Sequence, residues 1–162
     1  MVTALYPGTF DPVTMGHLDV AERSARLFGT VIVAVYDTPS KSLLFTTEER
    51  VALMRGAVAH VGNIVVQPFT GLVVNYARDQ GAATIIRGLR SSPDFEYESQ
   101  MFFMNRRLEP EVDMVALMSD QAHTFISSSL LKEVARLGGE ISGMVPPNVV
   151  GALREKFGSP VK

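Results

Sequence analysis

The sequence contains no cysteine among its 162 residues. It can therefore form neither a disulfide framework nor a metal site with thiolate ligands. No stretch approaches the roughly 18 consecutive apolar residues that a membrane-spanning helix requires. The N-terminus also lacks the basic region and long apolar run of a secretory signal. From these absences we expect a soluble, cytoplasmic protein that does not associate with membranes.

An excess of charge of one sign is missing as well. The formal net charge is -2 at pH 7, which argues against a general binder of nucleic acids or membrane surfaces. Hydrophobic residues make up 46% of the chain and charged residues 20%, so the chain can bury a core. The length suits one domain. We predict a single domain over residues 1–162, in which residues 146–162 form a C-terminal helix and tail.

Two common nucleotide-binding motifs are absent. The chain has no G-x-x-x-x-G-K-[ST] sequence, which excludes the phosphate loop of Walker-type proteins. It has no G-x-G-x-x-G sequence after its first apolar run, which argues against a dinucleotide-binding dehydrogenase. If the protein binds phosphate, it does so in another way.

What the sequence does have is a regular alternation of two apolar patterns. Short runs rich in β-branched residues predict strands, and apolar residues spaced three and four apart predict helices with one buried face. Thr46, with Glu49 three residues later, has the spacing of a helix capping box. The predicted strands are 2–6, 30–36, 63–69, 83–89 and 113–119, and the predicted helices are 16–28, 46–60, 71–81, 93–108, 127–139 and 146–158. This alternation predicts an α/β fold of the doubly wound, Rossmann-like kind, with a five-stranded parallel sheet and helices on both faces.

Polar residues gather in the loops that follow the predicted strands. In chain order these loops hold Thr9 and His17, Lys41, Arg87 and Arg90, and residues 127–129. Ligands of doubly wound sheets bind beyond the carboxyl ends of the strands. The helices that start near residues 16 and 127 offer unpaired N–H groups and a partial positive charge at that edge. The sequence therefore predicts a cleft for a ligand that carries several phosphates.

Longer motifs occupy these same loops. The sequence TMGH at residues 14–17 matches the [HT]-x-G-H signature of the nucleotidyltransferase superfamily. Together, GTFDPVTMGHLD, RGLR with DFEYE, and FISSSLLKEVARLGG closely resemble the bacterial phosphopantetheine adenylyltransferases, through about residue 147. The resemblance implies reversible transfer of the adenylyl group of ATP to 4'-phosphopantetheine, a step of coenzyme A biosynthesis that gives dephospho-coenzyme A and pyrophosphate. It also implies a magnesium ion, a homohexamer and feedback inhibition by coenzyme A.

The resemblance assigns roles to individual residues. It implies that His17 stabilises the transition state and that Lys41 and Arg90 complete the catalytic set. It implies ATP-binding roles for Thr9, Phe10, His17, Gly88, Leu89, Arg90, Glu98, His123, Thr124, Phe125, Ile126, Ser127, Ser128 and Ser129. It implies acceptor-binding roles for Thr9, Lys41, Val73 and Arg87.

The chemistry of this reaction fits the residue types present. A phosphate nucleophile is already mostly ionised near neutral pH, because its second pKa is about 6. The reaction then needs in-line placement and neutralisation of developing charge rather than a general base. The acidic residues show no metal-ligand spacing, so we expect Mg²⁺ to be held mainly by ATP phosphates and water, and we name no protein ligand.

Structural interpretations of the same residues remain open. His17 could be structural, and His60 is assigned such a role because a cation at a helix C-terminus favours the helix dipole. The two arginines could be solvent-exposed or could pair with Asp94 and Glu96, and the serines could be an N-cap alone. The apolar residues 101–104 could belong to a core, a subunit interface or a pantetheine-lining wall. Two other functions also remain: nucleotidyl transfer to another phosphorylated acceptor, such as nicotinate mononucleotide, and ATP binding without catalysis.

Overall fold

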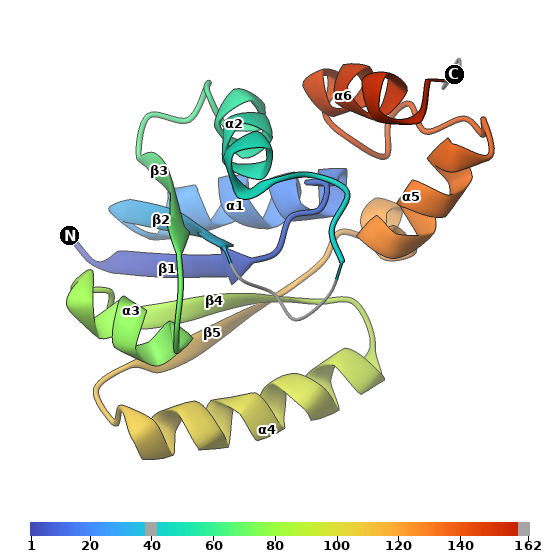
Figure 1. Ribbon diagram of the computed structural model, residues 1–162. Helices are drawn as coiled ribbons and strands as arrows, with labels where there is room; N and C mark the ends of the chain where they lie inside the picture. The colour runs from blue at the N-terminus through green and yellow to red at the C-terminus, as the bar shows by residue number, and fades with distance from the viewer. Residues whose placement is uncertain (38–41, 159–162) are drawn as a thin grey trace.

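The computed structural model describes residues 1–37 and 42–158. Its strands are β1 (Thr3–Gly8), β2 (Thr30–Tyr36), β3 (Ile64–Phe69), β4 (Thr84–Leu89) and β5 (Asp113–Met118). Its helices are α1 (Met15–Leu27), α2 (Thr47–Ala57), α3 (Val73–Asp79), α4 (Ser92–Leu108), α5 (Ser128–Arg136) and α6 (Pro147–Phe157), with a short 3-10 helix, η1, at Gln121–His123. The strands form one parallel sheet (Figure 1), so the predicted Rossmann-like α/β class is confirmed.

The sheet changes its direction of growth beside β1. The strand order is β3-β2-β1-β4-β5, so β1 and β4 flank the switch point at which such sheets bind ligands. The pairing of β1 with β4 stops at Leu5 and Ile85, whereas β1 pairs with β2 as far as Gly8 and β4 pairs with β5 as far as Leu89. The carboxyl ends of β1 and β4 are therefore parted and border a crevice.

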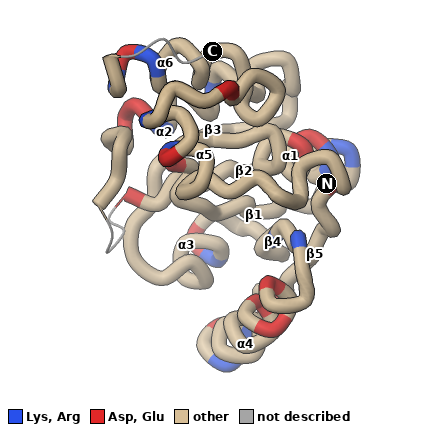
Figure 2. The backbone as a smooth tube through the Cα atoms, turned by 90° about the vertical axis from the view of Figure 1, so that its right-hand side faces the viewer, with Lys and Arg blue, Asp and Glu red and all other residues tan. Residues whose placement is uncertain are grey.

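Helices cover both faces of the sheet. Helices α1, α2, α5 and α6 lie on one face, and α3 and α4 lie on the other (Figures 1 and 2). Successive residues of β1 point to opposite faces: Ala4 and Tyr6 belong to the core beneath the first group of helices, and Leu5 packs with Val74 and Ala77 of α3. Burial on both faces explains why the central strands read as continuous apolar runs.

The longest of the described α-helices, α4, is also the least buried of them. Of its 17 residues, all of them described, only Glu98 is buried. Figure 2 shows α4 standing apart from the rest of the fold, below the sheet. Neither α4 nor any other helix in the described residues is both long and apolar enough to cross a membrane.

The capping box predicted for α2 is present, but the end of this helix differs from the prediction. Thr46 donates its N–H to Glu49 Oε2 at 2.8 Å, and Thr46 Oγ1 accepts the Glu49 N–H at 3.3 Å. The helix ends at Ala57, three residues before the predicted end. The position predicted for His60 at a helix C-terminus is therefore wrong: the residue lies beyond the helix, where its Nε2 contacts Glu22 Oε1 at 2.7 Å.

Candidate active site

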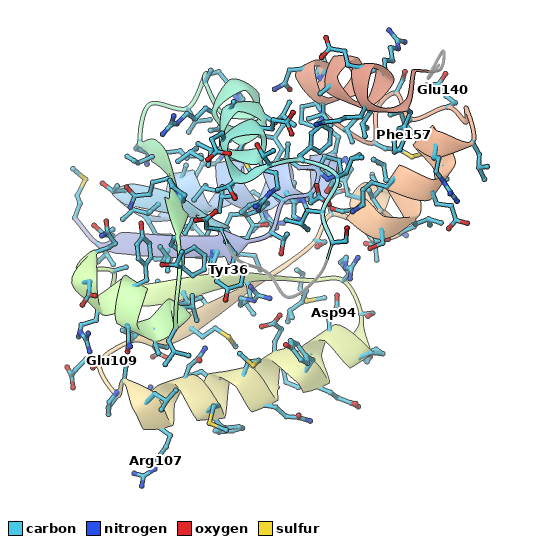
Figure 3. The ribbon with its side chains drawn as sticks, in the orientation of Figure 1. Tyr36, Asp94, Arg107, Glu109, Glu140 and Phe157 are labelled. Carbon is cyan, nitrogen blue, oxygen red and sulfur yellow. The ribbon has the colours of Figure 1, made fainter. Side chains whose placement is uncertain are left out.

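Two pockets open beside each other at the parted ends of β1 and β4. The polar pocket, of about 490 Å³, reaches toward α1 and the start of α5. The apolar pocket, of about 400 Å³, reaches toward α3 and α4. Figure 3 labels one residue of each, Asp94 at the start of α4 in the polar pocket and Tyr36 at the end of β2 in the apolar pocket. The residues that line both pockets, and so form a shared wall, are Pro7, Gly8, Thr9, Arg87 and Glu98.

His17 lines the polar pocket from the first turn of α1. Thr14 donates its backbone N–H to His17 Nδ1 at 3.0 Å, and Thr14 Oγ1 accepts the His17 N–H at 3.3 Å. This is a capping box in which histidine takes the place of the usual Glu or Gln. Because Nδ1 accepts a hydrogen bond, the neutral ring carries its proton on Nε2. Burial, with the positive charges of Arg90 and Arg87, lowers the pKa of His17 to about 4, so the ring is a neutral donor at physiological pH.

The turn before α1 is folded around a buried aromatic ring. Phe10 has a positive φ of 52°, and its ring packs edge-to-face against Tyr6 and His17, with centroids 5.4 and 5.1 Å apart. A Cβ at position 8 would lie 2.7 Å from the Phe10 ring. Gly8 therefore makes room for the Phe10 ring. The buried ring of Phe10 thus packs against the imidazole of His17 and limits its movement.

Both arginines at the end of β4 are paired with carboxylates of α4. Arg87 donates Nε and Nη2 to the two oxygens of Glu98 at 2.8 and 2.6 Å. Arg90 donates Nε to Asp94 at 3.0 Å and Nη1 to the carbonyl of Ile126 at 3.3 Å. Of the alternatives that the sequence left open for these arginines, the pairing with Asp94 is present. Glu96 lies on the exposed side of the helix, and Glu98 is the carboxylate that pairs with Arg87.

The serine turn at the start of α5 is both a cap and a wall of the polar pocket. Ser127 Oγ accepts the N–H of Leu130 at 3.2 Å, and Ser128 Oγ donates to the carbonyl of Pro12 at 2.9 Å. These hydroxyls already have partners within the protein. The first N–H groups of a helix lack intrahelical acceptors, so the backbone of this turn is the part that suits a phosphate.

Comparison with known proteins identifies the family. The model of the cytidylyltransferase-like family matches residues 5–134. A phosphopantetheine adenylyltransferase from Heliobacterium modesticaldum is 49% identical over 162 residues, which cover 100% of this chain and 96% of that protein. One from Synechococcus sp. (strain JA-3-3Ab) is 53% identical over 154 residues, which cover 95% of this chain and 97% of that protein. The chain belongs to the phosphopantetheine adenylyltransferase family. The resemblance carried by the three motifs is confirmed, and the Heliobacterium match also spans α6.

The fold of this family member is also found in a more distant protein. A solved structure from Vibrio parahaemolyticus, described as a "Putative Nicotinate-nucleotide Adenylyltransferase", superposes with a TM-score of 0.69. It shares 17% sequence identity, and the superposition covers 100% of this chain and 97% of that one. At this identity the likeness concerns the fold alone.

Most residues to which the phosphopantetheine adenylyltransferase resemblance assigns ATP contacts line the polar pocket. They are Thr9, Phe10, His17, Gly88, Arg90, Glu98, His123, Ile126, Ser127, Ser128 and Ser129. Leu89, Thr124 and Phe125 are not among the lining residues: Leu89 is buried in the protein interior, and Phe125 is 63% exposed. The pocket brings together His17, Arg90 and the serine turn. Their contacts with ATP remain predictions.

Three of the four residues to which the phosphopantetheine adenylyltransferase resemblance assigns acceptor contacts line the apolar pocket, and the fourth lies outside the described residues. Thr9, Val73 and Arg87 all line the apolar pocket. Lys41 lies outside the described residues, so its role stays a prediction; Ser42, which follows it, lines the polar pocket. His123 has a buried Nδ1 with no hydrogen-bond partner within the described part of the chain.

One ion pair at the site was missed by sequence reasoning. Lys132 of α5 lines the polar pocket, and its Nζ lies 2.5 Å from Oδ2 of the buried Asp11. The same carboxylate accepts the backbone N–H groups of Leu44 and Phe45 at 3.1 and 2.9 Å. Asp11 thus joins the loop after β1, the segment before α2, and α5. One feature of the sequence could have indicated Lys132. It follows Ser128 by one helical turn, so the two side chains lie on the same face of the helix.

A second missed residue is the buried Arg50 of α2, which is 1% exposed. It donates to the backbone carbonyls of Thr9 and Tyr36 at 2.7 and 2.8 Å and to Oγ1 of Thr47 at 2.8 Å. Arg50 therefore fixes the loop after β1 against the end of β2, beside both pockets. The sequence gives no such indication, because these partners are mainly backbone carbonyls.

Proposed function

We propose that this chain catalyses the reversible transfer of the adenylyl group from ATP to 4'-phosphopantetheine, giving dephospho-coenzyme A and pyrophosphate. The observation that carries the proposal is the shared wall between the two pockets. A nucleotide in the polar pocket and an acceptor in the apolar pocket would meet at Thr9 and Arg87, next to His17. Membership of the phosphopantetheine adenylyltransferase family supplies the identity of the reaction.

In the proposed mechanism the acceptor phosphate is the nucleophile. Near neutral pH it is largely dianionic, since its second pKa is about 6, so no side chain has to remove a proton. One of its oxygens attacks the α-phosphorus of ATP. A P–O bond forms to the acceptor as the bond from the α-phosphorus to the pyrophosphate oxygen breaks, and the leaving group departs with the electron pair.

The protein's part is to bind charge that develops in this step. Neutral His17 donates its Nε2–H to an oxygen of the α-phosphate and transfers no proton. Arg90 and the N-terminal N–H groups of α5 face the charge of the leaving pyrophosphate. Because these donors are held in place before reaction, they need little reorganisation in the transition state.

The apolar pocket suits the long arm of the acceptor. Its wall combines aromatic and aliphatic side chains with a few polar groups, including Tyr36, Phe69, Leu72, Val73, Met101, Asn105 and Met114. A pantetheine arm is a flexible chain with two amides, which such a lining can cover. A nicotinate mononucleotide acceptor would place a rigid, charged ring against the same surface. The apolar pocket therefore favours 4'-phosphopantetheine.

Magnesium is part of the proposal but requires no protein cluster. Within the described residues no group of three or more His, Cys, Asp or Glu side chains could hold a metal ion. The described side chains therefore do not fit a fully protein-bound ion. We propose that Mg²⁺ is held mainly by ATP phosphates and water, as is usual for this ion, and no step above depends on it.

Assembly, regulation and location are proposed from the family resemblance. A homohexamer is supported by the exposed aromatic residues Phe95, Tyr97 and Phe103 of α4, because large exposed apolar patches often mark interfaces. Feedback inhibition by coenzyme A is supported by its chemistry, since it carries the same pantetheine arm as the acceptor and would compete for the apolar pocket. We also propose that the protein is cytoplasmic, where ATP and the acceptor are present.

Pyrophosphate release measured with ATP, Mg²⁺ and separate phosphorylated acceptors tests the proposed reaction. We expect release with 4'-phosphopantetheine and none above background with nicotinate mononucleotide. Release only with the second acceptor would replace the proposed substrate. Saturable ATP binding with no release for any acceptor would support a binding domain without catalysis.

A further inference from the structure

A buried carboxylate lies in the pocket proposed to receive a polyanion. Asp11 lines the polar pocket and is 3% exposed. The nucleotide proposed for this pocket carries a triphosphate, and like charges repel one another more strongly where little water screens them. An acidic residue at this position therefore needs a structural reason to be there and a partner that neutralises its charge.

The structural reason is the segment immediately before α2. Asp11 accepts the backbone N–H of Phe45 on Oδ1 at 2.9 Å and the N–H of Leu44 on Oδ2 at 3.1 Å. Arg50 donates Nε to the carbonyl of Phe45 at 3.3 Å and Nη1 to the carbonyl of Thr9 at 2.7 Å. This buried network fastens the segment before α2 to the loop after β1. An ionised carboxylate suits the position, because it accepts at both oxygens, whereas a carboxamide has one oxygen acceptor.

The partner that neutralises this carboxylate is Lys132 of α5. Its Nζ lies 2.5 Å from Oδ2 of Asp11, and its side chain is 24% exposed. Lys132 follows Ser128 by one helical turn, and the hydroxyl of Ser128 donates to the carbonyl of Pro12, the residue after Asp11, at 2.9 Å. The start of α5 and the loop after β1 are therefore joined by a hydrogen bond and by an ion pair.

The acidic residues that line the polar pocket share this kind of pairing. Each has a cationic partner in the same lining: Asp11 with Lys132, Asp94 with Arg90, and Glu98 with Arg87. The side chain of Asp11 is 3% exposed, against 26% for Asp94 and 9% for Glu98. Water therefore screens the charge of Asp11 least, and this carboxylate depends most on its partner.

We propose that Lys132 is a positioning residue that acts through Asp11: it neutralises the carboxylate that holds residues 44–45, so that the triphosphate of ATP can bind beside it. The effect of Lys132 on ATP binding then arises through Asp11 and not through a contact of its own with the phosphates. To bind phosphate, Lys132 would have to leave a buried carboxylate without a partner, which is strongly unfavourable. This inference rests on the proposed function, because it assumes a triphosphate in the polar pocket.

Calorimetric titration with ATP and Mg²⁺ in the absence of acceptor tests this role in a cycle of variants. Lys132→Met should weaken ATP binding by about tenfold or more, because the unpaired carboxylate repels the triphosphate. Adenosine carries no charge, so its affinity should change by less than about twofold. Adding Asp11→Asn to Lys132→Met should tighten ATP binding again by about fivefold or more, since the source of the repulsion is then removed. A lysine that held phosphate directly, or one that only stabilised the fold, would give no such recovery.

Lys156→Met is the matched control. Lys156 also pairs with a carboxylate, that of Glu49 at 2.8 Å, and its side chain is 32% exposed, but it lines neither pocket. This variant should leave the affinity for ATP unchanged, and losses of equal size in Lys132→Met and Lys156→Met would overturn the proposal. So would a double variant at positions 11 and 132 that binds ATP no better than Lys132→Met.

A crystal structure of the unmodified protein with a non-hydrolysable ATP analogue carries the test if these variants do not fold. Lys132 Nζ should remain within hydrogen-bond distance of Asp11 when the analogue is bound. A hydrogen bond from Nζ to a phosphate oxygen would overturn the proposal. Absence of saturable ATP binding by the unmodified protein would instead reject the proposed function, and this inference with it.

Discussion

At the scale of single residues, His17 shows how a local backbone contact fixes a chemical state. The N–H of Thr14 occupies Nδ1, and burial of the ring, together with the charges of Arg90 and Arg87, opposes a second proton on it. A protonated His17 would attract phosphate more strongly, but it would bind the triphosphate of the ground state as well as the transition state. A neutral donor in a fixed position contributes mainly where charge develops.

Replacing His17 by alanine should lower kcat by about 10²–10³-fold, the usual loss when one preorganised donor is removed. The affinity for ATP should change little, because Arg90 and the start of α5 remain in the polar pocket. Pyrophosphate release gives kcat, and calorimetric titration with ATP in the absence of acceptor gives the affinity. His60→Ala is the control, since that histidine lines neither pocket and should leave both quantities unchanged. A loss of ATP affinity as large as the loss of kcat would assign His17 to ground-state binding.

The lowered pKa of His17 also predicts the pH dependence of the reaction. A ring with a pKa of about 4 stays neutral from about pH 5 upward, so its protonation cannot produce a change of rate near pH 6.5. The acid limb of kcat/KM should instead follow the second ionisation of the acceptor phosphate, near pH 6. The rate therefore falls as pH drops through 6, and the residual rate of His17→Ala should fall in parallel. Profiles of both enzymes between pH 5 and 9 check this; loss of the acid limb in the variant would contradict it.

At the scale of elements, α1 and α2 both begin with a capping box, and the two boxes differ in what they do. The box of Thr46 and Glu49 starts α2, and the box of Thr14 and His17 starts α1 and also holds the ring of His17. Each Thr side chain satisfies one N–H at the start of its helix, and such caps are worth about 1 kcal/mol. Of these two boxes, only the one at the start of α1 contains a residue proposed to act in catalysis, His17.

Thr14→Ala and Thr46→Ala should therefore have similar effects on stability and different effects on turnover. Each should lower the free energy of unfolding by about 1 kcal/mol, measured by urea denaturation. Thr14→Ala should also lower kcat by about three- to tenfold, because the first turn that carries His17 is less firmly held, while Thr46→Ala should leave kcat unchanged. Equal kcat values for the two variants would show that the Thr14 side chain caps the helix and nothing more.

Elements and their order follow from local patterns, and side-chain partners do not. The strands and helices could be predicted because apolar runs and three-and-four spacing are properties of adjacent residues. The gathering of Arg90 and the serine turn at one edge followed from the parallel sheet. The partner of Arg87 stayed open at the level of sequence because it depends on how α4 packs against β4. Asp94 and Glu98 are one turn apart and share a face of the helix, whereas Glu96 does not. The pair of Asp11 and Lys132 joins residues too distant in sequence for any local pattern to indicate.

At the scale of the whole molecule, the two faces of the sheet are covered unequally. Four helices form a continuous core on one face, and on the other α4 has a single buried residue, Glu98 (Figures 1 and 2). Its residues Phe95, Tyr97, Phe103 and Met104 are between 59% and 69% exposed. Such a helix gains little from burial within one chain, so contact with other chains would account for its apolar composition.

The double variant Phe103→Glu with Met104→Glu should break the proposed homohexamer. We expect the unmodified protein to sediment at six times the 17.7 kDa chain mass, and the variant to sediment as a smaller species, because carboxylates in an apolar contact would lose their hydration. Leu137→Glu is the control, since Leu137 is 75% exposed at the end of α5, and it should leave the mass unchanged. Circular dichroism of the variant should show an intact fold. If the variant keeps the mass of the unmodified protein, α4 is not the interface, and if the unmodified protein sediments as a single chain, the hexamer itself is excluded.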